Sequence, residues 1–171
     1  MKLYLMRHGP AEDRAESGFD ADRALTPKGR DRVRDVAQCL MAEDEAPLHI
    51  VSSPLVRAVQ TAEGVAAVTA LGERSGTLTI RRELALGAGA KGGLAILDEL
   101  WRIPMKRTLL VGHEPDMSAL FEHLMAMPLP VPFGKAMVVG LAIEGGSAKH
   151  RFILDPKELR IERAEIAGSF R

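Results

Sequence analysis

The chain has 171 residues, of which 46% are hydrophobic and 27% are charged, and this balance excludes a disordered or fibrous protein. Basic and acidic side chains both number 23, so no overall electric field draws the protein to nucleic acid or to an anionic membrane. No apolar run reaches the roughly 20 residues of a membrane span, and the N-terminus lacks the pattern of a signal peptide. We therefore expect one cytoplasmic domain that covers residues 1–171.

Short apolar stretches alternate with amphipathic stretches along the chain. Strands are predicted at 2–6, 48–51, 77–80 and 107–111, and helices are predicted to begin near Pro27, Pro54, Leu94 and Pro115. Two of these helix starts place a capping hydroxyl directly before a proline, in Thr26-Pro27 and Ser53-Pro54. Two further apolar stretches, at 136–143 and 149–154, complete the chain, with an antiparallel strand expected at the edge of the sheet.

This alternation predicts an α/β fold of three layers, in which a mostly parallel central sheet carries helices on both faces. Ligands of such folds bind where loops leave the carboxyl ends of the strands. The residues that follow each strand are therefore the first place to look for a site.

Polar residues follow three of the predicted strands directly. Arg7-His8-Gly9 ends the first, Ser52-Ser53-Pro54 leads from the second to Arg57, and Gly112-His113-Glu114-Pro115 ends the fourth. Helices open after two of these segments, and a helix N-terminus attracts an anion. Arginine matches phosphate oxygens with a two-pronged fork and keeps its charge. Together these segments predict a phosphate site.

The same residue types suit phosphoryl transfer. A neutral His8 could attack phosphorus and form a covalent intermediate, while Arg7, Arg57 and His113 neutralise the phosphoryl oxygens. Gly9 lacks a Cβ, so its backbone N–H is expected to approach the phosphate. Because no carboxylates or cysteines cluster at the spacing of metal ligands, we expect no metal and no other cofactor.

Four stretches also resemble the motifs of a known family. "MRHGPAEDR" (6–14), "LTPKGR" (25–30), "SSPLVRAVQTAE" (52–63) and "VGHEPDMS" (111–118) are similar to motifs of the histidine phosphatase superfamily, in its compact branch of SixA-type phosphohistidine phosphatases. The resemblance covers about residues 1–125 and implies the phosphoglycerate-mutase-like fold. It further implies that His8 is the nucleophile, that Arg7 and Arg57 bind phosphoryl oxygens, and that His113 is the second histidine of the pocket.

Two further features could contribute to this site. Glu83 resembles the acidic position of the wider superfamily, where it would act as a general acid; the alternative is a solvated carboxylate at a strand end. "GAGAKG" (87–92) fits the G-x-G-x-x-G pattern of dinucleotide sites, but we favour a flexible loop at the rim of the phosphate pocket, with Lys91 in contact with the substrate.

The length of the chain informs the choice of substrate. Only a few tens of residues separate Glu83 from His113, which leaves no room for a lid insertion. An open groove would admit a phosphorylated protein, such as one carrying phosphohistidine, and a small phosphomonoester could enter as well. A binding module without catalysis is a third hypothesis, although such a module has no need of a nucleophilic histidine. We expect neither nucleic acid nor a membrane as a partner.

Overall fold

The computed structural model describes residues 1–100, 102 and 106–169. The strands are β1 (Lys2–Arg7), β2 (His49–Ser52), β3 (Thr77–Ile80), β4 (Arg107–Gly112), β5 (Val138–Glu144), β6 (Ser147–Asp155) and β7 (Arg160–Ser169). The helices are α1 (Pro27–Ala42), α2 (Val56–Val68), α3 (Gly89–Leu100) and α4 (Asp116–Met125), with short 3-10 turns η1 (Asp20–Asp22) and η2 (Arg82–Leu84). None of the helices described is long and apolar enough to cross a membrane.

All the strands join one sheet in the order β3-β2-β4-β1-β5-β6-β7. The first four strands in this order pair in parallel, whereas β5, β6 and β7 continue the sheet through antiparallel pairs. Strands β1, β2, β3, β4 and β6 therefore run one way, and the prediction of a mostly parallel α/β sheet is confirmed. The expected antiparallel strand at the edge is present as β7, and β5 is a second strand that opposes the others, inside the sheet against β1.

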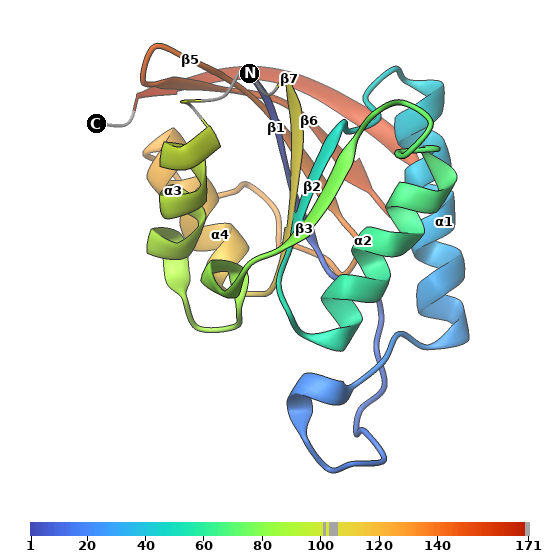
Figure 1. Ribbon diagram of the computed structural model, residues 1–171. Coiled ribbons are helices and arrows are strands. Elements are labelled where there is room, and N and C mark those ends of the chain that lie inside the picture. The colour runs from blue at the N-terminus through green and yellow to red at the C-terminus, as the bar shows by residue number, and fades with distance from the viewer. Residues whose placement is uncertain (101, 103–105, 170–171) are drawn as a thin grey trace.

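Helices cover both faces of the sheet. Helices α1 and α2 lie together on one face, and α3 and α4 lie on the other (Figure 1). Alternate residues of β1 face opposite ways: Leu3 and Leu5 join the core under α3 and α4, whereas Tyr4 and Met6 join the core under α1 and α2. Burial on both faces explains why this strand is a continuous apolar run.

Side-chain capping explains the start of α1 but not the start of α2. Thr26 accepts a hydrogen bond from the Gly29 N–H at 3.0 Å, so α1 begins at Pro27 as predicted. Helix α2 begins two residues beyond Pro54, at Val56. Helix α3 begins at Gly89, five residues before the predicted start near Leu94, so part of the expected glycine-rich loop is helical.

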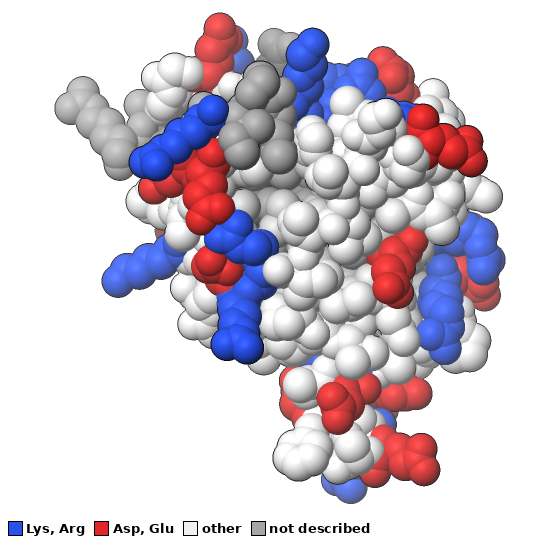
Figure 2. All heavy atoms as spheres, viewed as in Figure 1, with Lys and Arg blue, Asp and Glu red and all other residues white. Residues whose placement is uncertain are grey.

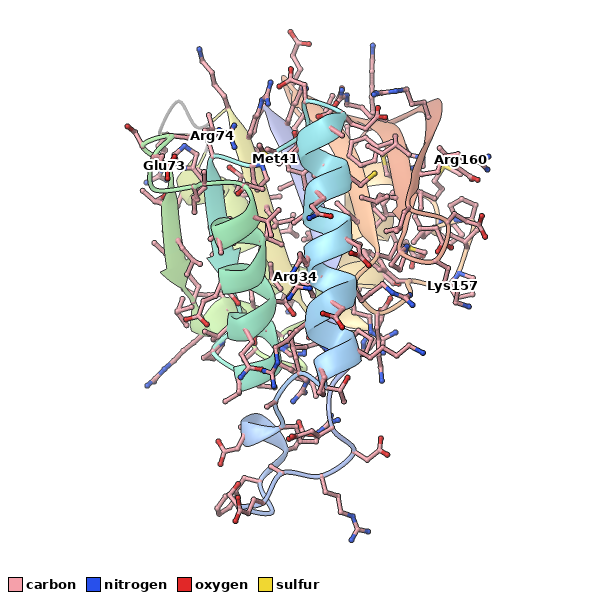
Figure 3. The ribbon with its side chains drawn as sticks, turned by 90° about the vertical axis from the view of Figure 1, so that its right-hand side faces the viewer. Arg34, Met41, Glu73, Arg74, Lys157 and Arg160 are labelled. Atoms are coloured by element: carbon pink, nitrogen blue, oxygen red, sulfur yellow. The ribbon has the colours of Figure 1, made fainter. Side chains whose placement is uncertain are left out.

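One segment projects from the carboxyl end of the sheet. Residues 12–24, the projecting loop, leave the body between Ala11 and Leu25, which form an isolated antiparallel bridge. The loop contains η1 and hangs below α1 and α2 in the side view of Figure 3. In Figure 2 acidic and basic side chains lie next to one another on this lowest part of the molecule. The loop therefore extends the edge at which the site is expected.

Candidate active site

His8 follows the last residue of β1 and is buried, with 6% of its surface exposed. Its Nδ1 lies 2.7 Å from the carbonyl oxygen of Gly9, and its Nε2 lies 3.3 Å from Nε of Arg57, which donates to it. A carbonyl oxygen can only accept, so Nδ1 carries the proton and Nε2 carries the lone pair. Burial lowers the pKa of His8 to about 3, with the nearby charges of Arg57 and Arg7 adding to the effect, so the imidazole is neutral at physiological pH.

Arg57 lies in the first turn of α2 and is 2% exposed. Besides the contact with His8, its Nη1 donates to the backbone carbonyl of Asp20 at 2.8 Å and its Nη2 donates to the Asp20 carboxylate at 3.0 Å. Each guanidinium nitrogen is thus engaged once. The projecting loop supplies two of the three acceptors.

His113 follows β4 and is buried beside His8, with 5.2 Å between the ring centroids. Its Nε2 lies 2.7 Å from the hydroxyl of Ser53, whereas its Nδ1 has no hydrogen-bond partner among the residues described. Burial, followed by the charge of Arg57, lowers the pKa of His113 to about 4. Both histidines of the site are therefore neutral in the absence of an anion.

Arg7 is the last residue of β1. Its Nη1 donates to the carbonyl of Phe133 at 2.9 Å, and its buried Nε has no partner within the described part of the chain. Burial lowers the pKa of this guanidinium, and the charge of Glu114 opposes that shift. Because buried N–H groups are normally paired, the free donor on Arg7 marks a place where an anion can accept a hydrogen bond.

The expected role of the Gly9 N–H is not supported, because that group is already engaged. It donates to the Thr61 hydroxyl at 3.0 Å. The absence of a Cβ has a different reason: a Cβ at Gly9 would meet Val33 of α1 at 2.8 Å. Glycine is therefore needed here for close packing of the loop on the helix.

Among the described contacts, Glu83 forms no hydrogen bond or ion pair with Arg7, Arg57, His8 or His113. Its carboxylate lies on η2 and accepts two hydrogen bonds from Arg81, at 3.2 Å and 2.6 Å. The hydrogen bond from Arg81 lowers the pKa of Glu83 to about 2. In this arrangement the group is an ionised carboxylate without a proton to donate.

Lys91 and the glycines before it belong to the start of α3. The backbone N–H groups of Gly87 and Gly89 donate to the Asp116 carboxylate at 2.7 Å and 3.0 Å, which ties this stretch to the first turn of α4. Gly92 packs directly on the backbone carbonyl of Glu83. The glycines thus permit close packing, and Lys91 is exposed without a polar contact to the site in the described structure.

Sequence reasoning missed Asp20 and Thr61, which contact the site, and named Ser53 only within the segment that leads to Arg57. Ser53 and Thr61 stand inside the quoted 52–63 stretch, and Thr61 follows Arg57 by one helical turn, so helical spacing could have linked them. No local pattern distinguishes Asp20 from the other acidic residues of the projecting loop. Only the folded chain brings it to Arg57.

The described residues contain no group of three or more histidine, cysteine, aspartate or glutamate side chains arranged to hold a metal ion. The site therefore brings together two arginines and two neutral imidazoles. Such a set has the chemistry to bind a phosphoryl group and to offer it a nucleophile.

Comparison with known proteins agrees with this geometry. The family profile of the histidine phosphatase superfamily (branch 1) matches residues 3–87. An uncharacterized protein of Picosynechococcus is 41% identical over 127 residues, which cover 72% of this chain and 73% of that protein. The phosphohistidine phosphatase SixA of Escherichia coli K12 is 27% identical over 165 residues, which cover 96% of this chain and 99% of the relative.

Among solved structures, that of the protein histidine phosphatase SixA complexed with tungstate superposes with a TM-score of 0.84. The two sequences are 25% identical, and the match covers 94% of this chain and 100% of the other. Fold, site and relatives lead to the same conclusion: the chain belongs to the histidine phosphatase superfamily and has the architecture of its compact, SixA-type members.

Proposed function

We propose that this phosphatase removes the phosphoryl group from phosphohistidine on a protein and carries that group transiently on His8. The observation that carries the proposal is the protonation state of His8. Its Nε2 carries a lone pair and lies 3.3 Å from Nε of Arg57. A neutral imidazole is a nucleophile, and an arginine at that distance can neutralise the group it attacks.

The reaction proceeds in two displacements at phosphorus. Nε2 of His8 forms a bond to phosphorus while the bond from phosphorus to the substrate nitrogen breaks, and the leaving imidazole takes up a proton. Water then attacks phosphorus, the bond to His8 breaks, and inorganic phosphate leaves. Arg7 and Arg57 neutralise the phosphoryl oxygens in both steps, and His113 donates a hydrogen bond from its otherwise unpaired Nδ1. No step in this scheme requires a metal.

Three arguments favour phosphohistidine over a phosphomonoester as substrate. An imidazole leaving group protonates readily near neutral pH, so this reaction needs no strong acid from the enzyme. Glu83, the acidic residue predicted from the sequence, is ionised and bound by Arg81. The similarity to a relative named phosphohistidine phosphatase supports the same choice.

The first test traps the intermediate. Wild type, His8→Ala and a control, His123→Ala, are mixed with a ³²P-phosphohistidyl protein and quenched within milliseconds; His123 is an exposed residue of α4. Acid-labile, alkali-stable label should appear on wild type and on the control, but not on His8→Ala. Turnover that persists in His8→Ala contradicts the nucleophile assignment.

The substrate is tested on the same preparations. The value of kcat/KM for the phosphohistidyl protein should exceed that for p-nitrophenyl phosphate and for a sugar phosphate. The reverse order would identify a small-molecule phosphomonoesterase. Phosphate binding without any turnover would identify a binding module.

A further inference from the structure

The projecting loop reaches the site through one residue, Asp20. Its carboxylate bridges two arginines: Oδ2 accepts from Nη2 of Arg57 at 3.0 Å, and Oδ1 accepts from Nε of Arg23 at 2.8 Å. Its backbone carbonyl accepts from Nη1 of Arg57 at 2.8 Å. Asp20 therefore holds Arg57 with both its main chain and its side chain.

These contacts fix the plane of the guanidinium. The two terminal nitrogens of Arg57 are anchored on Asp20, and Nε on the adjacent edge points at His8 Nε2, 3.3 Å away. A guanidinium has five N–H donors, and the three contacts use one hydrogen of each nitrogen. One hydrogen on each terminal nitrogen remains for a ligand, so the anchor leaves donors for a phosphoryl group.

Asp20 is itself held in place. Arg23, which fixes its second carboxylate oxygen, also donates to the backbone carbonyl of Glu12 at 2.7 Å, across the base of the loop. Although burial opposes ionisation, hydrogen bonds from Arg57 and Arg23 lower the pKa of Asp20 below its ordinary value. The carboxylate is thus ionised and fixed by two cations, although 58% of the side chain is exposed.

We propose that Asp20 is a positioning residue that orients Arg57 against His8 and thereby makes the projecting loop part of the active site. The inference rests on the proposed function and adds a residue outside the set of arginines and histidines. Without the carboxylate the guanidinium of Arg57 can rotate about its side chain, and its donors no longer match the phosphoryl oxygens in the transition state. Misplacement of this kind lowers kcat more than it changes substrate binding.

The same contacts admit a competing role. The Asp20 carboxylate could occupy Arg57 in place of the substrate and leave when phosphate arrives. The two roles predict opposite effects, because removal of a positioning group slows turnover, whereas removal of a competitor tightens phosphate binding and raises kcat/KM.

The experiment compares Asp20→Ala, Asp20→Asn and a control, Asp13→Asn, in the full chain. Asp13 is an exposed residue of the same loop with no hydrogen bond or ion pair among the described contacts. The readouts are kcat, KM, the affinity for inorganic phosphate and the midpoint of thermal unfolding. Asp20→Ala should lose about 10- to 100-fold in kcat with weaker phosphate binding. Asp20→Asn, which keeps an acceptor oxygen, should lose less, and Asp13→Asn should stay within about twofold of wild type.

A double-mutant cycle separates positioning from a general effect on the loop. In an Arg57→Ala background Asp20→Ala should add less than about a twofold loss, because the group through which it acts is gone. Tighter phosphate binding and a higher kcat/KM in Asp20→Ala would overturn the proposal, as would equal losses with and without Arg57. If the wild type binds phosphate without turnover, the proposed function fails, and the phosphate affinities of the variants still decide the role of Asp20.

Discussion

Two buried polar clusters lie at opposite ends of β1, and they are built differently. At the amino end the Glu45 carboxylate is surrounded by donors, and at the carboxyl end lies the candidate active site. Glu45 accepts hydrogen bonds from Tyr4 OH at 2.8 Å, from Lys2 Nζ at 2.9 Å, and from Arg151 at 2.7 Å and 3.1 Å. Both oxygens of this carboxylate accept hydrogen bonds, and its charge is balanced by the cations Lys2 and Arg151.

The active-site cluster is incomplete by comparison. Among the described contacts, Nε of Arg7 and Nδ1 of His113 lack partners, and both histidines are kept neutral beside two arginines. A cluster whose donors are all satisfied contributes to folding, whereas a cluster with unsatisfied donors and excess positive charge is stabilised only by an anion. The cluster at the amino end of β1 therefore stabilises the fold, whereas the cluster at its carboxyl end is suited to bind an anion.

The largest effect is expected from a substitution that breaks the amino-terminal cluster. Glu45→Ala leaves the Tyr4 hydroxyl and the Arg151 guanidinium without their buried partner, so the free energy of unfolding should fall by about 3–5 kcal/mol. Because Glu45 lies at the other end of the strand from His8, kcat per folded molecule should stay at the wild-type value. Urea unfolding and activity of the folded fraction measure the two quantities.

Glu43→Ala is the matched control, since Glu43 forms an exposed ion pair with Arg163 at 3.0 Å. An exposed pair contributes at most about 1 kcal/mol. A loss in Glu45→Ala no larger than in this control, or a loss of kcat, would contradict the separation.

The second comparison concerns the pH dependence of stability, because the two clusters lose their stabilising contributions over different pH ranges. The pKa values of His8 and His113 are about 3 and about 4, below the free value of 6.5. Between these values and pH 6.5 the unfolded chain therefore binds more protons than the folded chain. The contribution of these two neutral imidazoles to the free energy of unfolding is fully present above about pH 6.5 and is lost as the pH falls toward 4 and 3. Hydrogen bonds from Arg151, Lys2 and Tyr4 overcome burial and lower the pKa of Glu45 to about 2, so its contribution is lost only between about pH 4.5 and 2.

Replacing His113 by asparagine should therefore flatten the dependence of unfolding free energy on pH between 6.5 and 4, by up to about 1.4 kcal/mol per pH unit. Denaturant titrations at half-unit pH intervals provide the measurement. His123→Asn, a change at an exposed histidine, should leave the slope unaltered. An unchanged slope in His113→Asn would show that this imidazole already titrates normally.

The smallest effect concerns Glu83. Because Arg81 holds this carboxylate ionised, Glu83→Gln should change kcat toward phosphohistidyl protein by less than about threefold. Glu99→Gln, which removes the other carboxylate bound by Arg81, is the control. A loss of about 100-fold or more in Glu83→Gln alone would restore the general-acid role and bring Glu83 into the functional cluster.

Local signals were enough to predict the parallel part of the fold. Thr26-Pro27 predicted the start of α1, and the apolar run before Arg7 predicted β1, because capping and burial act on adjacent residues. Strand β7 was missed, since its exposed charges, such as Glu162 and Arg163, break the apolar alternation at this edge of the sheet.

In the site, too, some features could be predicted from local sequence and others could not. The motifs predicted that Arg57 and His113 join His8, and the structure brings these three together. The role of the glycines could not be predicted, because the contacts that require Gly9 and Gly92, with Val33 and with the Glu83 carbonyl, form only in the folded chain. Asp20 was missed for the same reason, since its contact with Arg57 spans 37 residues.

The strand order also has a consequence for how the protein is made. Strand β4 lies between β1 and β2 and provides their shared partner, so the first two strands synthesised are joined only when the fourth is inserted. His8 and Arg57 therefore reach their final relative position only when residues 107–112 enter the sheet. The same step brings His113, which follows β4, to the site. A chain without residues 107–113 therefore lacks both the shared partner strand and His113. Completion of the site coincides with formation of the most non-local contacts of the parallel sheet.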